Sequence, residues 1–182
     1  MARVLLIYAT THGHTAKIAA RVAGGLLAED VEVDVREVGD VGDASPADYD
    51  GTIVAASLHA HKHQGAMVDW AKHHHLALEA HPSAFLSVSL TAAEDTDDAR
   101  AATQECIDDF LDDTGWTPTR SLPVAGALQY REYDVFTRVL VRLMMSRGGH
   151  PTDVSHDYDY TDWDGLDRFG RDFAGLAKRD HS

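Results

Sequence analysis

Short apolar runs alternate with helical patterns along this chain, and no other feature limits its fold as strongly. Four runs have the length and the apolar content of strands that are buried on both faces: 4–9, 51–56, 83–88 and 121–127. Apolar residues recur with helical spacing in the intervals 15–27, 65–79, 96–114 and 162–178. This alternation favours an α/β fold, in which helices cover both faces of a parallel sheet.

One more strand pattern, at 31–38, differs because apolar and polar residues alternate in it. Such alternation is typical of a half-exposed strand, so we expect this strand near an edge of the sheet. The chain of 182 residues is long enough for one well-buried domain and too short for two. We therefore predict a single doubly wound domain, 1–182, with five strands.

Segment 128–161 interrupts the alternation, because a connection from a strand to a helix usually takes about 2–6 residues. The segment contains a helical pattern at 133–145, and in an otherwise acidic chain it carries Arg131, Arg138, Arg142 and Arg147. We interpret 128–161 as a functional insertion after or within the last strand. The alternative is a helix that only covers the end of the sheet.

The charge of the chain is strongly negative, with a net charge of −14, 23 Asp, 7 Glu, 12 Arg and only 4 Lys. Nucleic acid is not expected as a partner, because binding to phosphates requires a basic surface. Salt at about 1 M screens charges over roughly 3 Å and so removes most of this self-repulsion. A halophilic source is our hypothesis, and it requires thermal stability to rise between low and molar KCl. An ordinary acidic cytosolic protein is the alternative.

Cellular location is indicated by the single cysteine and by the start of the chain. Cys106 has no partner for an internal disulfide, which fits a reducing compartment, and we expect it to be a small core residue. No basic and apolar leader precedes the first strand, and no run of about 18 apolar residues occurs. We expect a cytoplasmic protein that does not span a membrane.

The loop Thr10-Thr11-His12-Gly13-His14-Thr15 connects the first predicted strand to the first predicted helix. Unpaired N–H groups and the helix dipole make such a helix start an anion site, and the threonine hydroxyls can add hydrogen bonds. The loop contains no Lys and no G-x-x-x-x-G-K-[ST] or G-x-G-x-x-G pattern, which disfavours a nucleotide triphosphate or a dinucleotide. The sequence predicts a site for a monophosphate.

Two further loops should lie at the same edge, because ligands of such sheets gather at the carboxyl ends of the strands. After the 51–56 strand come Ser57, Leu58, His59, Ala60 and His61, and after the 83–88 strand come Ser89, Leu90, Thr91 and Ala92. Small, polar and mostly uncharged loops suit a planar cofactor that bears a phosphate. No G-x-S-x-G elbow is present, so we expect the cofactor to supply the chemistry and predict no catalytic side chain.

Most of the twelve histidines are interpreted as surface residues. His63 and the cluster at 73–75 lack the spacing of a zinc site, and consecutive helical residues point in different directions. We therefore expect no built metal site. His59 and His61 are exceptions, because their loop should face the cofactor, and His12 and His14 are candidate extra donors to a phosphate.

The first loop resembles the T-x-T-G-x-T phosphate loop of flavodoxins, with Thr10, Gly13 and Thr15 in place and His12 at a position that usually holds a hydroxyl or small residue. The chain as a whole resembles the menaquinone-dependent protoporphyrinogen oxidase family, a flavodoxin-like group. The matching stretches are 82–90 (PSAFLSVSL), 116–120 (WTPTR), 124–130 (VAGALQY), 133–149 and 160–163 (YTDW).

This resemblance implies a flavodoxin-like sheet of strand order 2-1-3-4-5 that binds FMN without a covalent bond. The phosphate would lie on 10–15 and the isoalloxazine between the loops 57–61 and 89–92. The implied reaction oxidises protoporphyrinogen IX to protoporphyrin IX in heme biosynthesis and passes the electrons to menaquinone.

The insertion would then bind the substrate, because arginines can pair with the propionates of a porphyrinogen. The candidates are Tyr130, Arg131, Tyr133 and Arg138. The apolar face of 133–147 would contact quinone or the cytoplasmic surface of a membrane. The sequence leaves the oligomeric state open.

The sequence leaves two other functions open. One is a flavodoxin-like electron carrier or quinone reductase with a nicotinamide or protein donor. The other is a non-enzymatic module that binds flavin or, through its histidines, a metal. Flavin absorption in the purified protein separates the last of these from the redox functions.

Overall fold

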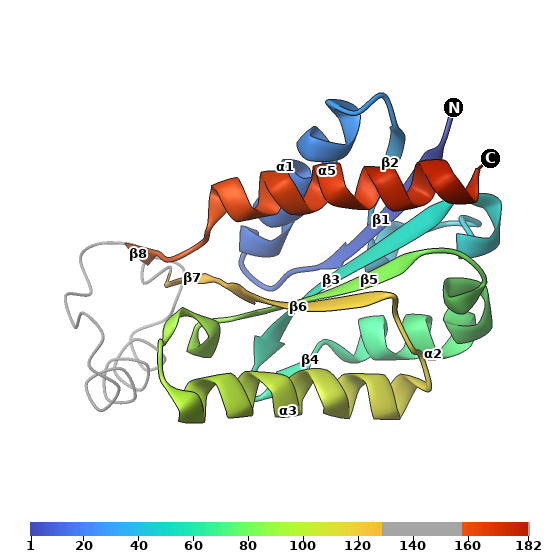
Figure 1. Cartoon of the computed structure of the whole chain (residues 1–182). Coiled ribbons are helices and arrows are strands. Elements are labelled where there is room, and N and C mark those ends of the chain that lie inside the picture. The colour runs from blue at the N-terminus through green and yellow to red at the C-terminus, as the bar shows by residue number, and fades with distance from the viewer. Residues whose placement is uncertain (129–157, 182) are drawn as a thin grey trace.

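The computed structural model describes residues 1–128 and 158–181, and its main elements follow the predicted order (Figure 1). They are β1 (Arg3–Ala9), α1 (His14–Leu27), β2 (Glu32–Glu37), β3 (Gly51–His59), β4 (Lys62–His63), α2 (Gly65–Ala80), β5 (Ser83–Ser89), α3 (Asp97–Thr114), β6 (Arg120–Ala125), β7 (Ala127–Leu128), β8 (Tyr158–Asp159) and α5 (Trp163–Asp180). Three short 3-10 helices lie at Val38–Asp40, Pro46–Asp48 and Thr91–Ala93.

The main sheet has the order β2-β1-β3-β5-β6, and all of these neighbours are parallel. This confirms the predicted order 2-1-3-4-5, in which β5 and β6 are the fourth and fifth strands. The alternating pattern of β2 is also explained, because β2 lies at one edge. The two-residue strand β4, antiparallel to β3, was not predicted.

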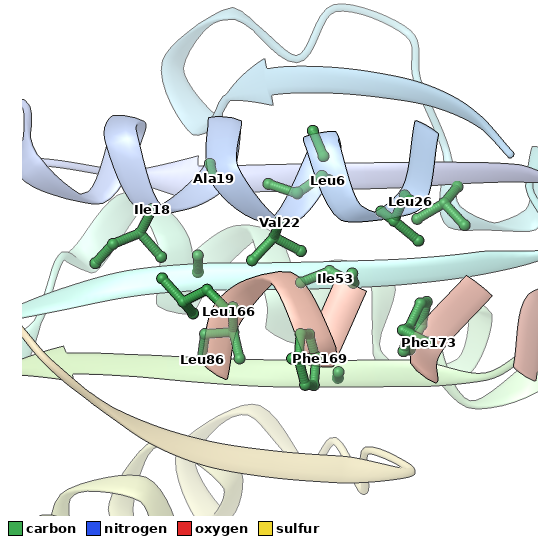
Figure 2. Close-up of a cluster of buried hydrophobic side chains, with 14 of the residues drawn as sticks. Leu6, Ile18, Ala19, Val22, Leu26, Ile53, Leu86, Leu166, Phe169 and Phe173 are labelled. Carbon is green, nitrogen blue, oxygen red and sulfur yellow. The ribbon is translucent and has the colours of Figure 1, made fainter. Parts of the chain in front are cut away.

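Helices cover both faces of the sheet, with α1 and α5 on one face and α2 and α3 on the other (Figure 1). Successive residues of a strand point to opposite faces, so each central strand contributes to two cores. Leu6 packs with Val22 of α1 and Phe173 of α5 in the first core (Figure 2), whereas Leu5 belongs to the second core with Phe85 and Trp116. The continuous apolar runs predicted this double burial.

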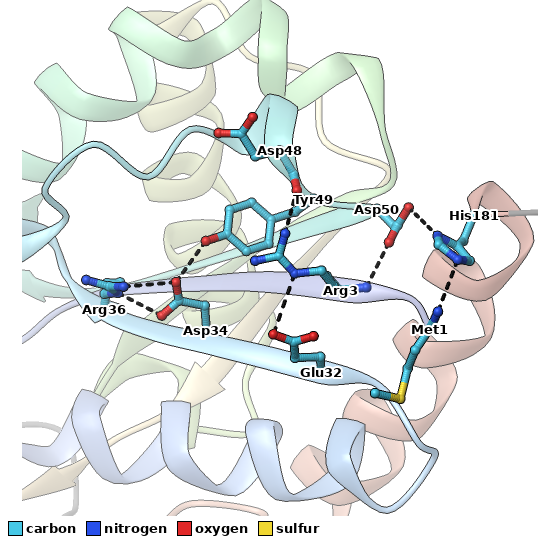
Figure 3. Close-up of polar contacts among 9 residues, drawn as sticks. All are labelled: Met1, Arg3, Glu32, Asp34, Arg36, Asp48, Tyr49, Asp50 and His181. Carbon is cyan, nitrogen blue, oxygen red and sulfur yellow. Dashed lines mark hydrogen bonds and ion pairs between the residues drawn. The ribbon is translucent and has the colours of Figure 1, made fainter.

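Polar contacts extend from the amino-terminal ends of β1 and β3 along the edge strand β2 (Figure 3). Asp34 of the edge strand accepts hydrogen bonds from Arg36 and Tyr49, and the bond from Arg36 is the largest factor that lowers its pKa. Asp50 accepts a bond from the backbone N–H of Arg3 at 2.8 Å, and its carboxylate lies 3.0 Å from Nδ1 of His181, the residue after α5. These contacts therefore link β1, the residue after α5 and the segment before β3.

The predicted insertion 128–161 begins and ends at one place. Strand β7 pairs with β8 in an antiparallel ladder, with Ala127 opposite Asp159 and Leu128 opposite Tyr158. The last predicted strand therefore ends at Ala125, and the chain leaves and returns beside Gly126. The helix predicted at 133–145 lies outside the described residues.

The interpretation of two side chains was wrong. Cys106 is half-buried and not a core residue, and burial, with Asp109 and Glu105 nearby, raises the pKa of its thiol. His63, interpreted as a surface residue, is buried at the end of β4. Its Nε2 lies 2.9 Å from Ser87 Oγ, and its ring meets Phe85 and Phe110 edge-on. The burial of His63 was not predicted, because it depends on the turn between β3 and β4, which no local sequence pattern indicated.

We expect His63 to make the protein sensitive to acid. Burial lowers the pKa of His63 to about 4, below the unfolded value of 6.5, so its contribution to stability is complete above pH 6.5 and is lost as the pH falls toward 4. The loss amounts to about 3 kcal/mol at about 1.4 kcal/mol for each pH unit. Urea unfolding at pH 7 and pH 4.5 should show that His63→Gln loses less stability between these values than the wild type. Equal losses would contradict the prediction.

None of the described helices is both long enough and apolar enough to cross a membrane. The same described residues contain no group of three or more His, Cys, Asp or Glu side chains that could hold a metal ion.

Candidate functional site

A pocket opens at the carboxyl ends of β1, β3 and β5, where the sequence predicted a cofactor. Its floor and walls come from the first loop, the end of β3, the end of β5 and the chain after β6. The lining residues are Thr10, Thr11, His12, His14, Thr15, Ser57, Leu58, His59, Val88, Ser89, Leu90, Gly126 and Ala127.

The first loop forms a tight turn that begins α1. Gly13 has a φ of 80° in the left-handed region, which glycine adopts without steric cost. Its N–H donates to Thr10 Oγ1 at 2.9 Å, so the loop closes on its own hydroxyl. Gly13 is also the N-cap of α1 and has no side chain to cap the helix. The first-turn N–H groups of α1 are therefore available to a ligand, and the helix dipole favours an anion there.

His14 connects the start of α1 to the segment that returns after residue 157. The side chain is only 8% exposed, and its Nε2 lies 2.8 Å from Thr161 Oγ1. The Thr161 hydroxyl donates its one hydrogen to the carbonyl of Ala125 at 2.9 Å, so it accepts from His14 and Nε2 carries the proton. Burial lowers the pKa of His14, against the opposing effect of Asp159. The ring is therefore neutral at pH 7, and only Nδ1 remains, buried and without a hydrogen-bond partner among the described residues.

The side chain of Gln64 forms hydrogen bonds with two residues that line the pocket. Its Nε2 donates to Ser57 Oγ at 2.7 Å and to Thr11 Oγ1 at 3.3 Å. Ser57 lies near the end of β3 and Thr11 in the first loop, so one amide links the predicted phosphate loop to the neighbouring strand. This residue was not among the sequence candidates, because nothing in a single Gln before a helix marks it as part of a site.

The pocket brings together most of the sequence candidates from all three predicted loops. The candidates that line it are Thr10, Thr11, His12, His14, Thr15, Ser57, Leu58, His59, Ser89 and Leu90. Gly13 acts through the turn and not through a side chain. Val88, Gly126 and Ala127 also line the pocket and were not predicted as site residues, because the sequence analysis placed them within the strands 83–88 and 121–127.

Four candidates lie elsewhere. Ala60 and His61, with φ values of 49° and 63°, form the turn between β3 and β4. His61 thereby lines a separate cleft between the start of α2 and α3. Thr91 and Ala92 lie in the 3-10 helix after β5, and Ala92 lines a groove beside β6.

The substrate candidates lie outside the described residues. Tyr130, Arg131, Tyr133 and Arg138 all belong to segment 129–157. The flanks of this segment are described, and Ala127 lines the pocket while Asp159 lies 3.8 Å from His14 Nε2. The segment therefore enters and leaves beside the pocket.

The lining fits a monophosphate that carries a planar apolar group. Thr10, Thr11, Thr15 and Ser57 bring hydroxyl groups to the lining, and among the described residues that line the pocket there is no Lys or Arg. A phosphate would therefore be held by N–H and O–H donors, which a helix start supplies. Leu58, Val88, Leu90 and Ala127 give apolar surface beside these donors.

Comparison with known proteins agrees with this geometry. The family model of the flavodoxin domain matches residues 5–155. A protein of Leishmania major named protoporphyrinogen IX dehydrogenase (quinone) is 38% identical over 96% of this chain and 75% of its own length. The protein of the same name from Escherichia coli K12 is 30% identical, and the match covers 97% of each chain.

Solved structures of flavodoxins share the fold. A flavodoxin from the domain Archaea superposes with a TM-score of 0.56 at 17% identity over 97% of this chain and 99% of its own. Flavodoxin 1 from Bacillus cereus has a TM-score of 0.54 at 15% identity over 96% and 98%. The strand order of the sheet and the lysine-free first loop are consistent with these matches. The chain therefore belongs to the flavodoxin domain family and, within it, to the group of proteins named protoporphyrinogen IX dehydrogenase (quinone).

Proposed function

We propose that this protein is an FMN-dependent oxidoreductase that oxidises protoporphyrinogen IX to protoporphyrin IX and passes the electrons to a quinone. One observation carries the proposal: the pocket at the sheet edge offers hydroxyl and N–H donors and, among the described residues, no Lys or Arg, in a chain of which two relatives of that name match 96–97%. The flavodoxin domain match supports FMN as the cofactor.

The residues of the first loop would hold the FMN phosphate. Thr10, Thr11 and Thr15 line the pocket with their hydroxyls beside the start of α1, and His12 lines it as well. Leu58 of β3 and Leu90, which directly follows β5, would contact the isoalloxazine. When bound, FMN takes up electron pairs from a donor and gives them to an acceptor.

The protein would orient the ring and tune it through nearby backbone donors and charges. Ser89 Oγ accepts from the N–H of Ala92 at 3.2 Å and its carbonyl accepts from the N–H of Gly126 at 3.0 Å, so the β5 loop is fixed beside the pocket. A fixed loop positions the ring without reorganisation during turnover.

The insertion supplies the substrate and membrane parts of the proposal, which rest on the sequence. Arg131 and Arg138 would pair with the propionates, and the apolar face of 133–147 would contact menaquinone or the cytoplasmic face of a membrane. The test of the first part is Arg131→Ala, which should raise the KM for protoporphyrinogen and leave FMN bound. An unchanged KM removes Arg131 from the substrate site.

The experiment for the function itself compares electron donors. The purified protein, loaded with FMN under anaerobic conditions with a menaquinone analogue, receives either protoporphyrinogen IX or NADPH. Formation of fluorescent protoporphyrin, with no oxidation of NADPH, is the expected result. Turnover with NADPH alone would instead identify a quinone reductase, and a protein that cannot take up FMN would exclude both.

A further inference from the structure

Gln64 controls the direction of two hydroxyl groups in the pocket. A side-chain amide carries two N–H hydrogens, and Gln64 Nε2 directs them at Ser57 Oγ and Thr11 Oγ1. Both hydroxyl oxygens therefore act as acceptors toward Gln64 and retain their own hydrogens for another partner. Thr10 is in the same state, because its Oγ1 accepts from the N–H of Gly13.

Both residues whose hydroxyls Gln64 contacts line the pocket, Thr11 from the first loop and Ser57 from the end of β3. With their oxygens engaged by Gln64, Ser57 and Thr11 can offer O–H donors to a ligand that only accepts hydrogen bonds. A carbonyl oxygen in the place of the amide nitrogen would have the opposite effect, because it would itself take those hydrogens. The orientation of the Gln64 amide therefore decides whether the hydroxyls of Ser57 and Thr11 donate hydrogen bonds to a ligand or accept them from it.

The oxygen of the same amide has no hydrogen bond within the described part of the chain that compensates for its burial. Gln64 Oε1 is buried and has no hydrogen-bond partner among the described residues. A buried acceptor without a partner is unfavourable, because it has given up its hydrogen bonds to water. The backbone of Gln64 is at the same time fixed at the start of α2, where its carbonyl accepts from the N–H groups of Met67 and Val68. The amide nitrogen therefore keeps its contacts with the two hydroxyls, while the amide oxygen of the same side chain has no partner among the described residues.

We propose that Gln64 is a positioning residue that turns the Thr11 and Ser57 hydroxyls into donors for the phosphate of the cofactor, and so selects a phosphorylated flavin. The inference rests on the proposed function, since it requires that the pocket binds FMN. Gln64 is not among the residues that line the pocket, so it would act through the two hydroxyls.

The test compares the dissociation constants of FMN and riboflavin for the wild type, Gln64→Glu and Gln64→Met, by quenching of flavin fluorescence at pH 7.5. A glutamate has the same shape but only accepts, so the hydroxyls donate to it and FMN binding should weaken about 30-fold or more. Methionine leaves the hydroxyls undirected, and binding should weaken by roughly threefold to tenfold. Riboflavin, which has no phosphate, should change little in either variant.

Three results would overturn the inference. FMN and riboflavin could weaken equally, which would mean that Gln64 only supports the fold. The loss in Gln64→Glu could vanish in molar KCl, which would assign it to charge repulsion, because salt screens charges. Both variants could bind FMN as the wild type does. Failure of the wild type to bind FMN would instead reject the proposed function, so the two failures are distinguishable.

Discussion

Replacing Thr11 by Asp should weaken FMN binding by about 100-fold or more, while riboflavin binding stays within a few fold of the wild type. Thr11 is exposed and lines the pocket beside the start of α1, so the new carboxylate would face the phosphate. Two unit charges about 4 Å apart repel by several kcal/mol near a protein surface, and 1.4 kcal/mol corresponds to tenfold in affinity. Titration of both flavins by fluorescence quenching measures the effect.

Thr11→Asn is the matched control, since it has the size of Asp and no charge. Its loss of FMN affinity should stay below about tenfold, the order expected for one changed neutral hydrogen bond. Part of the loss in Thr11→Asp should be recovered in molar KCl, because exposed charges are screened. If Thr11→Asp binds FMN as tightly as Thr11→Asn, the phosphate does not lie on this loop.

The largest expected effect on stability concerns the contact between α1 and α5. A Cβ on Gly170 would lie 2.6 Å from the carbonyl oxygen of Val22, and a Cβ on Gly25 would lie 2.8 Å from the carbonyl oxygen of Asp167. Both obstacles are backbone atoms, which cannot rotate away. We expect Gly170→Ala and Gly25→Ala each to lower the free energy of unfolding by about 2–4 kcal/mol, as overpacked cores do.

Gly24 gives the matched control, one residue from Gly25 in the same helix. A Cβ there meets nothing within 4 Å, so Gly24→Ala should raise the free energy of unfolding by about 0.5–1 kcal/mol through helix propensity alone. Urea unfolding of the three variants tests the contrast. A loss in Gly24→Ala similar to that in Gly25→Ala would show that the close contact of the helices is not the cause.

The sequence predicted the layers and the site edge because both depend on local patterns. Continuous apolar runs fixed the central strands, and the alternation in 31–38 placed β2 at an edge. The helix was predicted from residue 15 and begins at His14, directly after the loop, so the position of the pocket at the ends of β1, β3 and β5 could be expected.

What the sequence did not predict depends on contacts between distant residues or on unusual turns. The turn at Ala60 and His61 needs two residues with positive φ, and neither is the Gly or Asn that usually marks such a turn. That turn removes His61 from the pocket and buries His63. The amide of Gln64 and the His14 to Thr161 contact join positions that no local pattern relates.

The most direct test of the proposed function is the electron balance of a single anaerobic reaction. Conversion of protoporphyrinogen IX to protoporphyrin IX removes six electrons, and a quinone takes up two. Porphyrin fluorescence and quinone absorbance, followed together with the FMN-loaded protein, should therefore show three quinones reduced for each porphyrin formed. Porphyrin that forms at the same rate without the protein or without FMN, or quinone reduction that is unrelated to porphyrin formation, would contradict the function proposed for this pocket.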